Sequence, residues 1–202
     1  MSTMKNDTRS IMLVGVGGQG TILASKILTT GLISTGYDVK MSEIHGMSQR
    51  GGSVSTQVRF GRKVYSPIIG RGQADILVAF ETMEAMRYLP DLKVGGKIVV
   101  NDYKMPSMPI LAGDCEYPDG IIEELKSKAE TLVLDASAVA NEQGNPRGMN
   151  VVLLGALIRT LELQEIDWTA AVRSCMKSKL VDMNLRCLEA GMRTAEEVLK
   201  LI

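Results

Sequence analysis

Residues 11–20 read Ile-Met-Leu-Val-Gly-Val-Gly-Gly-Gln-Gly. An apolar run that stops at glycine is typical of a short buried strand, so we predict a strand at residues 10–14. Leucine and isoleucine then recur at helical spacing through residues 19–34, which predicts an amphipathic helix. A strand, a turn of the form Gly15-x-Gly17-x-x-Gly20 and a helix, in this order, are typical of the first unit of a parallel α/β sheet.

A second glycine-rich block follows the next predicted strand, at residues 37–44. Residues 43–52 read Glu-Ile-His-Gly-Met-Ser-Gln-Arg-Gly-Gly. In a βαβ unit the two parallel strands end at the same edge of the sheet, where open α/β sheets bind their ligands. We therefore expect both glycine blocks to line one crevice, which is the candidate functional site.

The rest of the chain continues with short apolar runs and helical patterns. Further strands are predicted at 74–80, 97–100 and 131–134, and helices at 81–88, 120–128, 150–161, 167–176 and 180–201. The last helix is expected to be interrupted near Gly191. Residues 105–118 contain three prolines, which predicts a loop or an edge segment.

One segment departs from this α/β alternation. Residues 53–60 alternate apolar and polar side chains, with Val54 and Thr56 on one face, which predicts a half-buried strand. Residues 61–63 look like a hairpin turn into a partner strand at 64–66. The predicted fold is one α/β domain over residues 1–202, a three-layer Rossmann-like sheet with an inserted β-hairpin and a helical C-terminal region.

Composition excludes several classes of protein. Lysine plus arginine and aspartate plus glutamate number 23 each, so no net charge draws the chain to nucleic acid or an anionic membrane. No apolar stretch approaches the roughly 20 residues that span a bilayer. The polar N-terminus lacks the apolar core of a signal peptide, and we expect a cytoplasmic protein.

A metal centre on this chain is not expected. The three cysteines are far apart and form no CxxC pair, whereas an iron–sulfur cluster needs four thiolates or substitutes. They are expected to be buried or inert thiols in a reducing compartment. The single histidine, His45, has no second histidine nearby with which to bind a metal ion.

Both glycine blocks suit an anionic ligand. The N-terminus of the helix after the first block offers free N–H groups and a partial positive charge to a phosphate or carboxylate. Glu43 follows Gly20 by 23 residues, about where a nicotinamide or flavin protein places the acid that binds ribose. Against that interpretation, Gly17-Gly18 is an unusually bare pair, and Gln19 is polar where an apolar residue is common. Close packing of strand and helix without a ligand is the remaining interpretation.

The second block adds the guanidinium of Arg50 to backbone donors, a combination that binds phosphate or carboxylate. Alternatively, it is a glycine-rich turn in which Arg50 pairs with a neighbouring acid. The chain also holds 13 methionines. Most are explained as core residues, but a second interpretation is an adaptable partner-binding surface that includes Met41, Met47, Met105 and Met108.

Together, the two glycine blocks and residues 150–157, Asn-Val-Val-Leu-Leu-Gly-Ala-Leu, resemble the gamma-type module of the 2-oxoacid:ferredoxin oxidoreductases. The resemblance covers about residues 10 to 200. The His-Gly-Met-Ser-Gln form of the second block is similar to the small (beta) subunits that act on aryl pyruvates such as indolepyruvate.

The resemblance implies a subunit that is inactive alone. In the enzymes of this family a 2-oxoacid and coenzyme A give acyl-coenzyme A, carbon dioxide and reduced ferredoxin. Thiamine diphosphate, magnesium and [4Fe–4S] clusters are then expected on a large partner subunit, with coenzyme A as co-substrate and no cofactor held by this chain alone. The isolated chain is expected to be able to homodimerise.

The resemblance also points to residues that bind a cofactor or face the partner, without separating the two roles. They are Gly15, Gly17, Gly18, Gln19, Gly20, Glu43, His45, Ser48, Gln49, Arg50, Gly51 and Gly52. No catalytic residue and no metal ligand is assigned. Two other functions stay open: a standalone nucleotide-binding Rossmann protein, and a non-catalytic binding or regulatory module.

Overall fold

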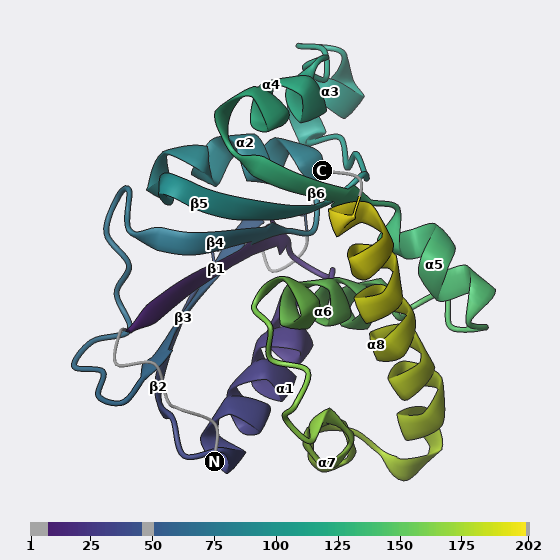
Figure 1. Ribbon diagram of the computed structural model, residues 1–202. Coiled ribbons are helices and arrows are strands. Elements are labelled where there is room, and N and C mark those ends of the chain that lie inside the picture. Colours follow the sequence, from purple (N-terminus) through teal and green to yellow (C-terminus); the bar gives the residue numbers. More distant parts are fainter. Residues whose placement is uncertain (1–7, 46–50, 201–202) are drawn as a thin grey trace.

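The computed structural model describes residues 8–45 and 51–200, and its centre is a six-stranded mixed sheet (Figure 1). The strand order is β2-β3-β1-β4-β5-β6. The strands are β1 Arg9–Val16, β2 Asp38–His45, β3 Ser53–Gly61, β4 Ala74–Ala79, β5 Leu92–Asn101 and β6 Glu130–Leu134. The helices are α1 Thr21–Ser34, α2 Thr82–Tyr88, α3 Met108–Ala112, α4 Ile121–Lys128, α5 Ala136–Glu142, α6 Met149–Thr160, α7 Trp168–Cys175 and α8 Ser178–Leu199, with a 3₁₀ turn η1 at Leu89–Asp91.

Helices cover both faces of the sheet, which confirms the predicted three-layer α/β class. Successive side chains of β1 enter different cores, because strand side chains alternate between the two faces. Ile11 and Leu13 belong to the core that α1, α6 and α8 complete. Met12 and Val14 belong to the core beneath α2 and α4. In Figure 1, α2 and α4 lie on one side of the sheet, and α1, α6 and α8 lie on the other.

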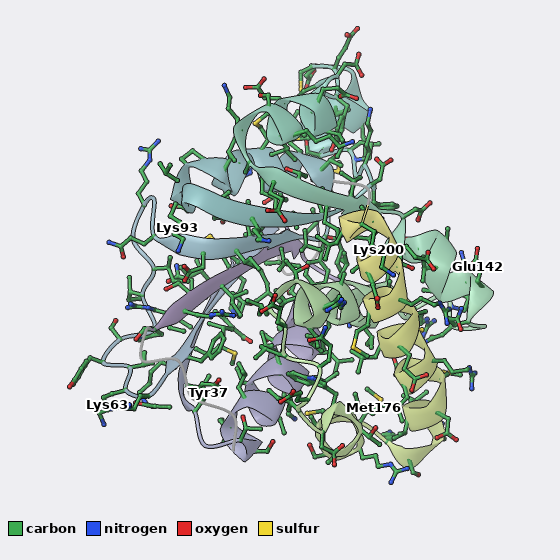
Figure 2. The ribbon with its side chains drawn as sticks, in the orientation of Figure 1. Tyr37, Lys63, Lys93, Glu142, Met176 and Lys200 are labelled. Carbon is green, nitrogen blue, oxygen red and sulfur yellow. The ribbon has the colours of Figure 1, made fainter. Side chains whose placement is uncertain are left out.

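The strand predicted at residues 53–60 is present as β3, but it is an interior strand. It pairs antiparallel with β1 on one side and with β2 on the other. Its apolar face is completed by Phe60, which meets Tyr37 edge to face with ring centroids 5.2 Å apart (Tyr37 is labelled in Figure 2). Its polar face is buried as well, with Ser55 2% and Gln57 7% exposed, so the expectation of a half-buried strand is wrong.

The hairpin is formed by β2 and β3, and residues 64–66 form no strand. The segment that contains them covers the polar face of β3. Gln57 accepts a hydrogen bond from the backbone N–H of Ile69 at 2.7 Å, and Arg59 donates to the carbonyl oxygens of Ser66 and Ile68 at 3.3 and 3.2 Å. These side chains satisfy the backbone of the covering segment, so it needs no second strand to pair with.

Helix α8 is continuous through Gly191, so the predicted interruption there is wrong. Gly191 and Gly155 lie where α8 crosses α6. A Cβ atom on Gly191 would lie 2.0 Å from the carbonyl oxygen of Val152, and one on Gly155 would lie 2.2 Å from that of Leu188. The absence of side chains allows the two helix backbones to touch.

The other differences concern element boundaries and short helices. β5 begins at Leu92, five residues before the predicted strand, and passes through Gly95 and Gly96. The proline-rich segment contains the short helix α3, and α5 follows β6 where no separate helix was predicted. Within the described residues, no helix combines the length and apolar character needed to cross a membrane.

Candidate functional site

A crevice of about 420 Å³ lies at the carboxyl ends of β1 and β2, beside the N-terminus of α1. Both strands run antiparallel to β3, so they are parallel to each other and end at the same edge of the sheet. The crevice is lined by Gly17, Gly18, Gly20, Thr21, Ile22, Glu43, Ile44, His45, Val54, Ser55 and Thr56. One crevice is therefore bordered by three glycines of the first block and by the start of the second block, residues 43–45, although β3 lies between their strands.

The first glycine block connects β1 to α1, and the N-terminus of α1 borders the crevice. Gly20 is the N-cap residue and has a φ of 80°, a left-handed conformation that favours glycine. The side-chain amide of Asn150 donates to the carbonyl oxygen of Gly20 at 3.1 Å. No side chain caps α1, and its first turn holds no acidic residue. Since the first N–H groups of a helix have no partner within the helix, this end attracts an anionic group.

Gly15 and Gln19 belong to the same motif but do not line the crevice. The side-chain oxygen of Gln19 accepts from the backbone N–H of Val16 at 2.7 Å, and its side-chain nitrogen donates to the carbonyl oxygen of Phe80 at 3.1 Å. A Cβ atom on Gly15 would lie 2.7 Å from that oxygen of Gln19 and 2.9 Å from the Cβ of Phe80. These two residues therefore shape the turn from inside the protein.

The second glycine block contacts the first through backbone hydrogen bonds. The N–H of Gly17 donates to the carbonyl oxygen of Gly52 at 2.8 Å, and the N–H of Gly51 donates to the carbonyl oxygen of Gly17 at 3.4 Å. Gly51 has a φ of 77°. Gly51 and Gly52 do not themselves line the crevice, but they are bonded to Gly17, which does, and the N–H of Gly17 is occupied by this pairing.

The end of β2 supplies two further predicted residues, Glu43 and His45, which line the crevice. They pair with Thr56 and Val54 of β3. Five residues of the second block, Gly46, Met47, Ser48, Gln49 and Arg50, lie outside the described residues. The roles expected for Ser48, Gln49 and Arg50 therefore stay predictions.

Sequence reasoning did not name part of the wall of the crevice. Ile22 and Ile44 line it and are 57% and 53% exposed, which gives the crevice an apolar border beside its polar helix end. The alternating pattern of residues 53–60 placed Val54 and Thr56 on one face, and that signal would have led to the β3 wall. Nothing in the local sequence indicated that Asn150, 130 residues away, holds Gly20.

The described residues contain no cluster of three or more histidine, cysteine or acidic side chains that could hold a metal ion. The three cysteines are free thiols: Cys115 is exposed, Cys175 is partly buried and Cys187 is buried. Burial raises the pKa of the Cys187 thiol, so this residue stays protonated in the core.

The sequence of this chain matches known proteins of one family. Residues 10–194 match the family described as pyruvate ferredoxin/flavodoxin oxidoreductase. The chain is 38% identical over 200 residues to the indolepyruvate oxidoreductase subunit IorB of Thermococcus kodakarensis, which covers 95% of this chain and 98% of the relative. It is 36% identical over 193 residues to the subunit of the same name from Methanothermobacter thermautotrophicus, covering 93% of this chain and 98% of that protein.

Solved structures share the fold. The gamma subunit of a keto/oxoacid ferredoxin oxidoreductase from Geobacter sulfurreducens has a TM-score of 0.70 at 24% identity, over 94% of this chain and 99% of that chain. A 2-oxoglutarate:ferredoxin oxidoreductase from Magnetococcus marinus has a TM-score of 0.74 at 19% identity, over 96% of this chain but 32% of that chain. Since the family match and the IorB relatives extend over nearly the whole sequence, this chain belongs to the pyruvate ferredoxin/flavodoxin oxidoreductase family.

Proposed function

We propose that the chain is the small subunit of a cytoplasmic enzyme that oxidatively decarboxylates aryl pyruvates such as indolepyruvate. The observation that carries this proposal is that sequence identity is higher to relatives named for indolepyruvate than to relatives named for other 2-oxoacids. Subunits named for indolepyruvate are 36–38% identical to this chain. A relative named for ketoisovalerate is 28% identical, and a gamma subunit common to pyruvate and ketoisovalerate oxidoreductases is 24% identical.

The proposed reaction joins a 2-oxoacid and coenzyme A to give acyl-coenzyme A and carbon dioxide, with two electrons passed singly to two ferredoxins. Thiamine diphosphate, with magnesium, supplies carbanion chemistry in such reactions, and [4Fe–4S] clusters carry single electrons. We assign these groups to a larger partner subunit. The described part of this chain offers no metal-binding cluster, and its three cysteines are too few for a [4Fe–4S] site.

In this reaction, the chain binds the anionic part of coenzyme A in its crevice. The uncapped N-terminus of α1 presents N–H groups suited to a phosphate, and Gly18, with a φ of 106° and open space around it, lets a ligand approach the backbone. The volume of about 420 Å³ lies within the usual range of small-molecule sites. The apolar border formed by Ile22 and Ile44 suits the uncharged parts of the same molecule.

The fold argues against the standalone dinucleotide-binding alternative. In that fold the ribose-binding acid ends the strand next to β1. Here β3 lies between β1 and β2, so Glu43 is two strands away from β1, roughly 10 Å across the sheet. The non-catalytic alternative is decided by assay.

The test is anaerobic co-expression of the chain with the large subunit from the same organism, followed by assay of ferredoxin reduction. We expect reduction with indolepyruvate that requires coenzyme A and both subunits, and weaker reduction with pyruvate or 2-oxoglutarate. Activity of the isolated chain would contradict a subunit role. Preference for a small aliphatic 2-oxoacid would contradict the substrate class, and a complex inactive with every 2-oxoacid would favour the non-catalytic module.

A further inference from the structure

Two buried carboxylates lie at the N-terminal end of α2, where Glu81 is the N-cap residue and Glu84 is in the first turn. The sequence analysis predicted no role for either of them. Glu84 is 4% exposed. It accepts a hydrogen bond from the Ser53 hydroxyl and another from the Arg87 guanidinium, the latter at 3.1 Å. Hydrogen bonds to ionised carboxylates are among the stronger ones in proteins. The contact therefore fixes Ser53 to α2.

Ser53 occupies the position where the two glycine blocks meet. It is the first residue of β3, opposite Val16 at the end of β1. The preceding residues, Gly51 and Gly52, make the backbone hydrogen bonds with Gly17. Because glycine backbone is the most conformationally free, these two residues depend on a firm attachment at their ends. On the β3 side, Ser53 is attached in two ways: it pairs with Val16 of β1, and its side chain contacts Glu84 and, at 3.5 Å, the Tyr88 hydroxyl of α2.

Glu81 in turn holds Glu84 in place. It is 1% exposed, and its carboxylate caps α2 by accepting from the backbone N–H of Glu84 at 2.9 Å. It also accepts from the N–H of Met105 at 3.1 Å and from the Tyr117 hydroxyl. A buried carboxylate is retained only when its oxygens are hydrogen-bonded, and here each oxygen has a donor. The turn that carries Glu84 is consequently attached, through Glu81, to Met105 and Tyr117.

We propose that Glu84, acting through Ser53, is a positioning residue for the crevice: it holds Gly51 and Gly52 against Gly17 and thereby sets the affinity for the phosphates of coenzyme A. The inference rests on the proposed function for the identity of the ligand. Neither Glu84 nor Ser53 lines the crevice, so their effect passes through the backbone of the second glycine block. Arg87 lies on the other side of Glu84 with a side chain 54% exposed, and its removal should leave the crevice unchanged.

The first test measures amide hydrogen exchange in the full chain without its partner. In Ser53→Ala the N–H of Gly17 should exchange about tenfold faster than in the unmodified chain, because its acceptor Gly52 is no longer held. Ser53→Thr keeps the hydroxyl and should restore protection. Ser127→Ala, which removes an exposed hydroxyl in α4, should change nothing at Gly17. Unchanged protection of Gly17 in Ser53→Ala would overturn the proposal.

The second test uses the complex with the large subunit. Ser53→Ala should raise the KM for coenzyme A about tenfold and leave kcat and the KM for indolepyruvate unchanged. Ser53→Thr should recover the original value, and Glu84→Gln, which keeps an acceptor oxygen, should have a smaller effect than Ser53→Ala. A loss of kcat with equal changes in both KM values would indicate general structural damage and overturn the proposal.

The two tests separate the inference from the proposed function. If the unmodified complex oxidises no 2-oxoacid, the proposed function and the link to coenzyme A are both overturned, whereas the exchange of Gly17 still decides whether Glu84 and Ser53 hold the glycine blocks. If the complex is active and the KM for coenzyme A is the same in Ser53→Ala, only the positioning role is overturned.

Discussion

Gly20 is the residue at which backbone conformation and packing restrict the crevice together. In Gly20→Ala the new Cβ would lie 2.5 Å from the side-chain nitrogen of Asn150, at a φ of 80°. The left-handed backbone costs about 1–2 kcal/mol for a non-glycine residue, and losing the Asn150 hydrogen bond costs about 1 kcal/mol more. We expect this variant to lose roughly 2–3 kcal/mol in the free energy of unfolding, measured with urea.

The matched control for that measurement is Gly36→Ala. Gly36 has a φ of 88° and open space where the Cβ would lie. Its substitution should therefore lower the free energy of unfolding only by the cost of the left-handed backbone, about 1–2 kcal/mol. Equal losses in the two variants would show that the contact of Gly20 with Asn150 contributes nothing.

Tyr117 should make the free energy of unfolding fall as the pH rises into the alkaline range. Its pKa is raised above the ordinary tyrosine value of 10.0, first because burial disfavours the charged form and next because its hydroxyl donates to Glu81. Above about pH 10 the unfolded chain loses this proton while the folded chain keeps it, so the stabilisation is present below that pH and falls as the pH rises.

The measurement is the difference in unfolding free energy between the unmodified chain and Tyr117→Phe, followed from pH 8 to pH 11. This difference should be constant up to about pH 10 and shrink above it. Because other groups titrate equally in both proteins, a difference that stays constant to pH 11 would contradict the raised pKa.

At the residue scale, the sequence predicted which glycines form the turn, but it did not predict which distant residues contact that turn. The spacing of Gly17 and Gly20 reflects local backbone requirements, which a sequence displays directly. Gln19 looked out of place for a nucleotide-binding turn, and its structural reason is the carbonyl group of Phe80, 61 residues away. Such a contact depends on which strands become neighbours, and no local pattern encodes that.

At the scale of elements, α6 and α8 cross with their backbones in contact, which leaves no room for a side chain at Gly155 or Gly191. In a solvent-exposed helix, Gly191→Ala would stabilise by about 1 kcal/mol through helix propensity. Here the Cβ would lie 2.0 Å from the carbonyl oxygen of Val152, so the helices must separate. We expect a net loss of about 1–3 kcal/mol in the free energy of unfolding, the usual cost of overpacking.

Glu189→Ala is the control for Gly191→Ala, because Glu189 is an exposed residue of the same helix. It should change stability by less than about 0.5 kcal/mol. If Gly191→Ala were as stable as this control, the backbone contact between α6 and α8 would be looser than the structure indicates.

β3 illustrates what periodicity can and cannot predict for an element. Alternation correctly separated the two faces, with Val54 and Thr56 together. It could not tell whether the polar face meets water or other protein. Gln57 and Arg59 are polar because they bind the backbone of the segment that covers them. A polar residue that satisfies buried backbone and one that faces solvent look alike in a sequence.

At the scale of the whole molecule, the chain corresponds to a module that also occurs inside longer proteins. It covers 36% of a ketoisovalerate oxidoreductase subunit and 32% of the matched chain of the Magnetococcus enzyme. A module used in this way needs a surface for its neighbours. The segment around α3 offers one, since α3 has no buried residue and Met108 and Leu111 are 75% and 67% exposed. Met108 is one of the four methionines for which a partner-binding surface was the second interpretation of the sequence.

We therefore expect Met108→Asp to weaken binding of the proposed large subunit about tenfold or more, because the interface would have to bury an unpaired carboxylate. The stability of the isolated chain should be unchanged, since Met108 packs against no buried core in the described structure. Titration of the purified large subunit, followed by calorimetry, gives the affinity.

Val94→Asp is the control that makes this binding experiment specific to one face. Val94 is fully exposed near the start of β5, whereas α3 follows the end of the same strand, so the two residues lie at opposite edges of the sheet. If the large subunit binds at the edge that carries both the crevice and α3, it can reach the crevice directly, and only Met108→Asp is affected. Weakened binding by Val94→Asp alone would place the partner at the far edge, from which it could not complete the crevice.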